Sequence, residues 1–273
     1  MDFDFSQIAV PFRMQPGLQR VPADGSHLTP LVPGSAMHTE KLKVLELQQS
    51  RYAMADFDAE PALAAIAFHA KLPQQSQPLE LAFEEDFAVL DGTTGTIPWL
   101  CVSLPSHWAP EEKIGLSLAQ IHAPVADNTA LLAATSGLVK LVTQGGYWER
   151  YVWTMTPSPR YDQHPRRHPR TPWPDIDNID AFAALCHLRV ERQAFLPVFD
   201  ARGGPLRQAV FTIRVMLEPL SQGVRNRRAA LRLHDALASM SEAVLDYKNL
   251  MPARARLLPW LAARSHDPGL VAQ

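Results

Sequence analysis

The sequence predicts an α+β domain, in which helices pack around one antiparallel β-sheet. Two pairs of β-rich runs predict hairpins: FAVLD and TIPWLCVSL surround a Gly-Thr turn at residues 92–95, and CHLRVERQAFLPVF and RQAVFTIRVMLEPL surround a Gly-Pro turn at residues 201–205. Apolar residues then recur at helical spacing over residues 226–263. These hairpins predict the sheet, and the helix that follows predicts a layer packed against it.

The composition indicates a globular chain with no general affinity for polyanions. Of 273 residues, 47% are hydrophobic and 20% are charged, which is enough apolar content for a core. The formal net charge of −2 favours neither nucleic acid nor an anionic membrane, and we expect the chain to bind neither.

Three features predict a cytoplasmic location. Cys101 and Cys186 have no metal-binding or redox spacing, which favours a reducing compartment. No apolar run approaches ~20 residues, and the acidic start MDFDFSQ lacks the basic segment of a secretory signal. The absence of a CxxCH pair also excludes covalent attachment of c-type haem.

The N-terminal part is predicted to be an arm with two helices. Prolines recur through residues 1–36, which we expect to be irregular. One helix is predicted over residues 36–55, and a second opens at Glu60 and ends at Pro73. The predicted organisation is an arm with helices that pack on the core, then the core with its C-terminal helix, then a frayed tail: residues 1–75, 76–263 and 264–273.

Between the hairpins, the pattern predicts helices, a strand and a long loop. The acidic trio at residues 84–86 is predicted to be a solvated turn, and Pro98 indicates an edge or a bulge in its strand. Asn128 is the expected N-cap of a helix over residues 128–143. The run YWERYVWTM predicts a strand, and prolines predict a loop over residues 156–178.

The stretch Trp108–Val125 predicts a helix with a sharp start and a sharp end. Pro110 suits a first helical turn, and Pro124 prevents continuation. His122 then lies at the end of the helix beside an apolar face, where a neutral imidazole could ligate a metal or a haem iron. The alternative is a structural histidine whose ring is bonded to the last carbonyls of the helix.

Other charged residues also allow two interpretations. Arg166, Arg167, His168 and Arg170 make the long loop basic, either as a solvated segment or as a clamp for haem propionates or an acidic electron-transfer partner. In the second hairpin, alternation puts Arg192 on one face of its strand and Glu191 on the other. Charges inside strands must be solvated or paired, and a buried arginine must meet an anion.

The common signatures of nucleotide, zinc-protease and serine-hydrolase sites are missing. The sequence contains no P-loop, no GxGxxG after a strand, no HExxH and no GxSxG. From these patterns alone, the sequence predicts a soluble α+β domain with a cofactor site near His122.

Several segments together resemble the haem-dependent oxidative N-demethylase alpha-subunit-like family. They are PFRMQPGL, EEDFAVL, LPSHWAPEEKIGLSLAQIHAPV, WERYVWTM, LRVERQAFLPVF with FTIRVMLEPL, and YKNL, in an order that covers nearly the whole chain. The resemblance implies a PAS-like antiparallel sheet with flanking helices that holds one b-type haem. It also implies oxidation of a small methylated amine (dimethylamine-like) by O2, with release of formaldehyde. Electrons would come from NADPH through separate flavin (FMN) and iron–sulfur (2Fe-2S) components, and an oligomer is compatible with this.

The resemblance assigns roles to seven residues. His122 becomes the axial ligand of the haem iron, and Arg214 is the first choice to face bound oxygen or substrate, with Arg192 and Glu191 as further catalytic candidates. Sheet salt bridges are the alternative for these three. The remaining cofactor-binding candidates are Trp108, Trp153 and Arg167.

The chain departs from the family pattern near the expected pocket. Val152 stands where the pattern Arg-x-Asn-Trp has asparagine, no proline follows Val125, and the turn at residues 200–208 is longer than usual. A polar group lost near the pocket could change the substrate or end catalysis. Three functions therefore stay open: a haem monooxygenase, a haem-based sensor or gas-binding module, and a non-catalytic subunit without haem.

Overall fold

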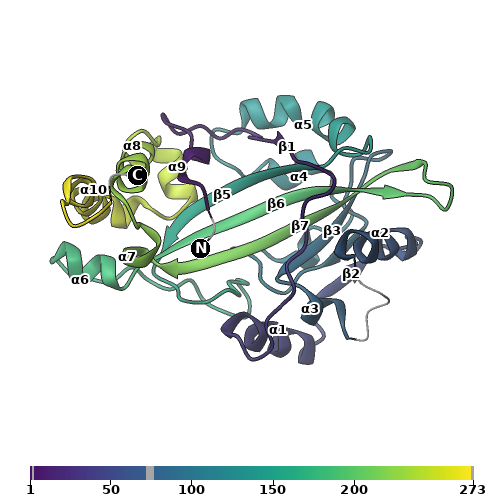
Figure 1. Ribbon diagram of the computed structural model, residues 1–273, viewed down its shortest axis with the longest axis horizontal. Coiled ribbons are helices and arrows are strands. Elements are labelled where there is room, and N and C mark those ends of the chain that lie inside the picture. The colour runs from purple at the N-terminus through teal and green to yellow at the C-terminus, as the bar shows by residue number, and fades with distance from the viewer. Residues whose placement is uncertain (2, 72–76, 272–273) are drawn as a thin grey trace.

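A seven-stranded antiparallel sheet forms the centre of the protein in a computed structural model that describes residues 1, 3–71 and 77–271 (Figure 1). The strand order is β1-β5-β6-β7-β3-β4-β2, and every neighbouring pair is antiparallel. The strands are β1 (Gln19–Arg20), β2 (Arg51–Ala53), β3 (Glu85–Asp91), β4 (Trp99–Cys101), β5 (Trp148–Thr156), β6 (His187–Phe199) and β7 (Pro205–Pro219). The predicted α+β class and both hairpins are confirmed.

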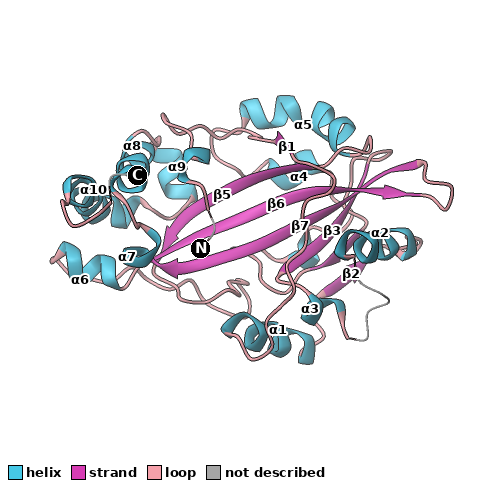
Figure 2. Ribbon diagram, in the orientation of Figure 1, coloured by secondary structure: helices cyan, strands magenta, loops and turns pink. Residues whose placement is uncertain are grey.

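Helices flank the sheet and gather at one of its ends (Figure 2). The α-helices are α1 (Ala36–Glu46), α2 (Glu60–Ala70), α3 (Leu79–Ala82), α4 (Leu118–His122), α5 (Thr129–Val142), α6 (Ile179–Ala184), α7 (Leu220–Gly223), α8 (Arg227–Ala238), α9 (Glu242–Tyr247) and α10 (Met251–His266). Two 3-10 turns, η1 (Phe5–Gln7) and η2 (Pro110–Glu112), complete the description. The proline-rich segment at residues 157–178 is loop, as its composition predicts.

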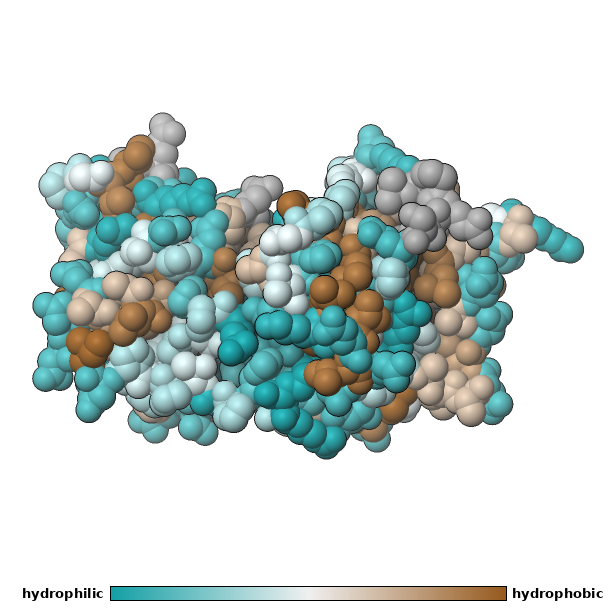
Figure 3. Space-filling view, turned by 90° about the horizontal axis from the view of Figure 1, so that it is seen from below, coloured by the Kyte–Doolittle hydropathy of each residue, from teal (hydrophilic) through white to brown (hydrophobic). Residues whose placement is uncertain are grey.

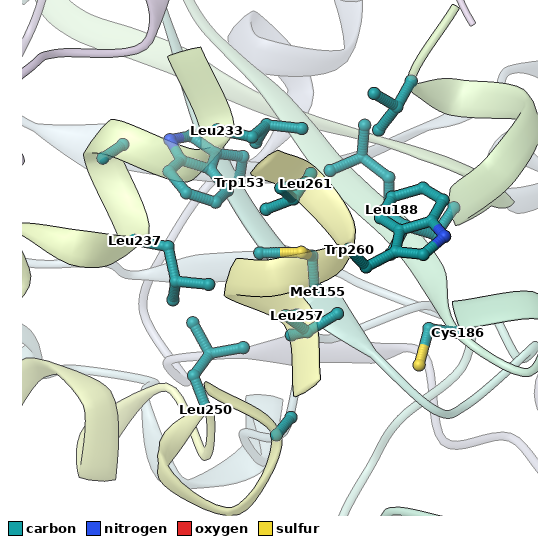
Figure 4. Packing of buried hydrophobic residues seen from close by; sticks show 14 of the residues in the cluster. Trp153, Met155, Cys186, Leu188, Leu233, Leu237, Leu250, Leu257, Trp260 and Leu261 are labelled. Atoms are coloured by element: carbon teal, nitrogen blue, oxygen red, sulfur yellow. The ribbon is translucent and has the colours of Figure 1, made fainter. Parts of the chain in front are cut away.

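The long hairpin β6–β7 joins several apolar clusters. Leu188 and Val190 of β6 pack with the C-terminal helices in a cluster that includes Trp153, Leu233 and Trp260 (Figure 4). Farther along the same face of β6, Leu196 packs against α2, whereas Phe195 packs on the opposite face with residues from α4 and α5. On the face seen in Figure 3, apolar side chains lie between hydrophilic ones, and exposed large hydrophobic residues include Val32, Phe68 and Val271.

The N-terminal part contributes strands as well as helices. The helix predicted over residues 36–55 ends at Glu46, Gln48 has a positive φ of 56°, and Arg51–Ala53 then pairs with β4. Because β2 covers β4, the strand after Pro98 is not at an edge of the sheet. The prediction of one continuous helix was wrong here because strand pairing with a distant partner overrides local helix propensity.

The acidic trio is not a solvated turn. Glu85 and Asp86 are buried at the start of β3, and Glu84 is bonded to a strand arginine. Lys41, fully buried on α1, lies 3.0 Å from Asp86 and donates to the carbonyls of Phe83 and Glu85. This contact ties α1 to the sheet, since a buried charge needs such partners.

Two further end-of-element predictions have different outcomes. Helix α2 ends at Ala70 with Lys71 in the left-handed region, and the predicted end at Pro73 lies outside the described residues. The predicted frayed tail is corrected, because α10 continues to His266 and Val271 pairs with Asn226.

Candidate active site

A cavity of about 480 Å³ lies between the sheet, α4 and the long loop. Its volume falls in the range of small-molecule and cofactor sites. Apolar side chains from β3, β4, α4, β6 and β7 form much of its wall: Leu90, Leu100, Leu118, Ile121, Phe195 and Phe211. Such a lining excludes water and strengthens the few polar contacts inside.

His122 lines this cavity from the end of α4. The helix is shorter than predicted: Gly115, with a φ of 74°, separates η2 from α4, and a capping box of Ser117 and Gln120 starts α4. The predicted helix over Trp108–Val125 is therefore corrected to two separate turns. Its end at His122 is retained, because the chain turns away before Pro124.

The ring of His122 has a defined tautomer. Its Nδ1 lies 2.7 Å from the carbonyl oxygen of Leu118, which can only accept, so Nδ1 carries the proton. Burial and the nearby Arg150 lower the pKa of His122, and the Leu118 carbonyl partly offsets them. The neutral ring therefore presents an Nε2 lone pair, and Nε2 makes no hydrogen bond within the described part of the chain. The alternative of a ring satisfied by helix carbonyls holds for only one of its nitrogens.

Asn128 supports the position of His122 in an unexpected way. Its Nδ2 donates to the carbonyls of His122, at 3.2 Å, and Ala123, at 2.8 Å. Asn128 stands at the N-cap position of α5, but its side chain makes no capping hydrogen bond there. Asn128, the predicted N-cap of α5, thus caps carbonyls at the C-terminus of α4 and connects the two helices.

A hydrogen-bonded polar row crosses the floor of the cavity. The carboxylate of Glu191 accepts from the Ser106 hydroxyl through one oxygen and from Gln193 Nε2, at 2.6 Å, through the other. Arg150 Nε donates to Gln193 Oε1 at 2.8 Å, and Arg189 Nε donates to Ser106 Oγ at 2.8 Å. Alternation along β6 places Arg189, Glu191 and Gln193 on the cavity face, and Arg150 of β5 shares this face because it is the register partner of Gln193.

Arg189 is the buried anchor of this row. Its side chain donates to the carbonyls of Leu104, Arg160 and Tyr161 at 3.0–3.3 Å, and it is 2% exposed. Burial lowers its pKa, and the nearby Glu191 raises it. Arg189 shares the face of Glu191 through strand alternation, and it connects two loops to the sheet through these carbonyls.

Three of the predicted site residues lie outside the cavity, and these expectations are corrected. Arg214 pairs with Glu84 at 2.7 Å and Arg192 with Glu149 at 2.8 Å, on the face of the sheet opposite to Glu191. Their positions follow from strand alternation, because residues 192 and 214 are register partners and side chains of one pair share a face. The cross-strand salt bridge was the alternative interpretation of both. Arg167 is bonded to Asp162 and to the Ser103 carbonyl.

Four predicted residues do line the cavity: His122, Glu191, Trp108 and Trp153. Trp108 packs beside the cluster of α4 and α5. Trp153 is 6% exposed, and its ring belongs to the core shared with the C-terminal helices (Figure 4). The backbone carbonyl of Trp153 takes part in the polar contacts described next.

Sequence reasoning missed several basic side chains of the cavity, among them Lys248 and His107. Lys248 donates to the Trp153 carbonyl at 2.9 Å, and burial lowers its pKa to about 8, against an opposing effect of Glu191. His107 has a φ of 61°, and burial with Arg170 and Arg189 lowers its pKa to about 4. Both lie in segments that carry the family resemblance, YKNL and LPSHW, which was the available signal.

The basic loop is largely paired, but it supplies one cation to the mouth of the cavity. Arg166 bonds Glu111 and Glu112, whereas Arg170 is exposed and lines the cavity together with the half-buried Lys113. This arrangement suits the binding of an anionic group at the entrance.

The donor set fits a haem better than a bare metal ion. Within the described residues, no group of three or more His, Cys, Asp or Glu side chains could hold a metal. Haem iron needs one axial side chain from the protein, and the cavity offers His122, apolar walls and cations at its mouth.

The comparison with protein families agrees with this chemistry. Residues 53–258 match a family model described as "Haem-dependent oxidative N-demethylase, alpha subunit-like". The match spans most of the chain and includes the strands and the helix whose apolar side chains line the cavity, whereas Met14, Gln15 and Leu18 of the lining lie before it. No helix in the described ranges is long and apolar enough to cross a membrane.

Proposed function

Because this chain belongs to the haem-dependent oxidative N-demethylase alpha subunit-like family, we propose that its cavity binds one b-type haem through His122 and oxidises a small methylated amine. The family description names an alpha subunit, so its members resemble one component of a multi-subunit enzyme. The substrate, the axial ligand and the electron donors are our proposals.

The single observation that carries the proposal is the ring of His122. The bond from Nδ1 to the Leu118 carbonyl leaves an Nε2 lone pair in an apolar cavity. A hydrogen bond from the ring nitrogen that does not bind the metal orients a metal-ligating histidine and makes it more basic. His107 also lines the cavity, but its ring makes no hydrogen bond among the described residues.

The rest of the cavity would complete the site. A bound haem would supply an iron able to react with O2 once it is reduced. Lys113 and Arg170 would bind the two propionates at the mouth, and the apolar wall would keep water away from the reacting methyl group. Val152 lies opposite Glu191 in the register, and both residues line the cavity.

Glu191 would hold the amine. An ammonium N–H would donate to its carboxylate, which Ser106 and Gln193 keep in place. The same carboxylate can accept the N–H proton of the amine before oxidation. The expected products are the demethylated amine and formaldehyde.

Electrons would come from outside the chain. The sequence contains no nucleotide-binding fingerprint. NADPH would therefore deliver electrons through a separate reductase subunit that carries FMN and a 2Fe-2S cluster. Turnover should require this added component.

A spectral comparison of two histidine variants tests the proposal. Wild type reconstituted with haem should show a Soret band of histidine-ligated iron, His122→Ala should lose or shift it, and His107→Ala should retain it. Both variants should stay folded by circular dichroism. An unchanged ferric spectrum in His122→Ala would remove His122 as the ligand. Reductase-driven formaldehyde release separates a catalyst from a haem-binding sensor.

A further inference from the structure

The cavity has more positive charge than a haem and a simple amine require. Among the described residues, five Lys or Arg side chains line it, against the single carboxylate of Glu191: Lys113, Arg150, Arg170, Arg189 and Lys248. A cation removed from water is unfavourable unless an anion or several hydrogen bonds compensate it. The partners of each cation therefore indicate which anions the cavity takes.

Three of the five cations have a clear function. Arg189 donates four hydrogen bonds, to three carbonyls and to the Ser106 hydroxyl. Arg170 is exposed and Lys113 half-buried at the mouth, where the propionates of the proposed haem would lie. Arg150 and Lys248 are left, and both line the same cavity.

Arg150 carries a half-buried guanidinium that forms no ion pair with a described carboxylate. Its Nε donates to Gln193 and its Nη1 makes a long contact, 3.4 Å, with the Pro16 carbonyl, so Nη2 is available. Burial lowers the pKa of Arg150, and Glu191 is the charge that opposes this. One amide, that of Gln193, separates the guanidinium from the Glu191 carboxylate.

Lys248 is similarly placed. It forms no ion pair with a described residue, and of its three ammonium protons one is used by the Trp153 carbonyl. The rings of Phe12 and Trp153, with centroids 5.6 and 6.0 Å from Nζ, stabilise the charge in part. The ammonium can still bind an anion in the cavity.

We propose that the amine oxidised here also carries a carboxylate, which Arg150 and Lys248 bind while Glu191 binds the ammonium. This inference rests on the proposed function and specifies its substrate class as small N-methyl amino acids. The charges match such a zwitterion, whose ammonium and carboxylate are one carbon apart, because a single amide separates Glu191 from Arg150. Dimethylamine would leave Arg150 and Lys248 without an anion.

The test compares two ligands that differ by the carboxylate. N-methylglycine and dimethylamine are titrated into the haem-loaded protein, with binding followed by difference spectra and calorimetry. We expect N-methylglycine to bind at least ~10-fold more tightly than dimethylamine, because one charge-assisted hydrogen bond contributes enough free energy for a difference of this size. Calorimetry at pH 8 in buffers of different ionisation enthalpy should also show uptake of about half a proton, because the carboxylate raises the pKa of Lys248 from about 8.

Variants assign the selectivity to residues. Arg150→Gln and Lys248→Met should each weaken N-methylglycine ~10-fold or more and change dimethylamine affinity less than ~2-fold. Lys248→Arg should retain part of the preference. The exposed cations Lys140 and Arg202 provide matched controls, Lys140→Met and Arg202→Gln, which should change neither affinity.

Two results would overturn the inference. One is equal binding of both amines to wild type, which needs no variant. The other is weaker haem binding in Arg150→Gln and Lys248→Met with unchanged amine selectivity, which would assign both cations to the propionates. A protein that takes up no haem would refute the proposed function instead, and calorimetry of N-methylglycine on the haem-free protein would still decide the substrate class.

Discussion

At the residue scale, the parity of position along β6 decides which charges can reach the cavity. Glu191 and Arg192 are neighbours in the chain, yet one lies in the polar row of the cavity and the other pairs with Glu149 on the opposite face. Because a strand turns successive side chains to opposite faces, their chemistry separates completely. Glu191 is the sole carboxylate of the described cavity lining. If its charge is removed by mutation, no other carboxylate of this lining can replace it.

Glu191→Gln is expected to weaken amine binding and leave haem binding intact. The amide retains the shape of the carboxylate but loses the charge that binds an ammonium, and a hydrogen bond to a charged group contributes roughly 1.5–3 kcal/mol. Amine affinity, measured by difference spectra, should fall by about 10- to 100-fold. Glu46→Gln, on an exposed position of α1, is the control and should bind amine as wild type does. Unchanged amine affinity in Glu191→Gln would move the amine site elsewhere.

At the element scale, a five-residue helix fixes the proposed ligand. Helix α4 is too short to be stable alone, and it depends on the Ser117–Gln120 capping box at its start and on Asn128 at its end. Leu118 packs into the apolar cluster and also supplies the carbonyl that orients His122. The five residues of α4 and its caps therefore combine helix capping, core packing and the orientation of the proposed ligand.

Ser117→Ala should lower both stability and haem affinity. The loss of the N-cap costs about 1 kcal/mol and loosens the turn that carries His122. Ser35→Ala is the matched control, because Ser35 caps α1 through the same bond to a backbone N–H, away from the cavity. Denaturant unfolding should show similar losses for both variants, whereas haem titration should show weaker binding for Ser117→Ala alone. Equal haem affinities would mean that the cap does not position His122.

At the scale of the whole molecule, buried ion pairs fasten the N-terminal part to the sheet. Lys41 contacts Asp86 from α1, and Arg51 of β2 makes two hydrogen bonds of 2.7 Å with the buried Glu80. Burial raises the pKa of Glu80, but the hydrogen bonds from Arg51 and Ser50 outweigh it and bring the pKa to about 2. Arm and core therefore depend on each other through ionised groups.

This pair predicts a specific loss of stability in acid. The pKa of Glu80 is lower in the folded protein than its ordinary value of 4.5, so its contribution is complete above that value and is lost as the pH falls toward about 2. The contribution is roughly 3 kcal/mol. Urea unfolding should show Glu80→Gln less stable than wild type at pH 7, with the gap closing below pH ~4. The exposed Glu242→Gln should show no such gap, and a gap independent of pH would contradict the assigned pKa.

Local sequence determined the hairpins, the long loop and the end of the helix at His122. Alternating β-branched residues specify strands wherever they lie, and Pro124 stops a helix without help from the rest of the chain. The strand β2 was not predictable in this way, because its three residues become a strand only when β4 offers a free edge. A local sequence pattern therefore predicts an element when the interactions that stabilise it lie within that element and its immediate neighbours in the chain.

Tertiary structure decided which face of the sheet became the site. Alternation separates Glu191 from Arg214, but only the placement of α4 and the long loop over one face assigns the cavity to Glu191. Lys248 and Arg150, about a hundred residues apart in the chain, share that cavity because the C-terminal helices return to the edge of β5. The burial of a side chain and the charges around it depend on segments that are far apart in the sequence. A local sequence pattern therefore cannot predict them.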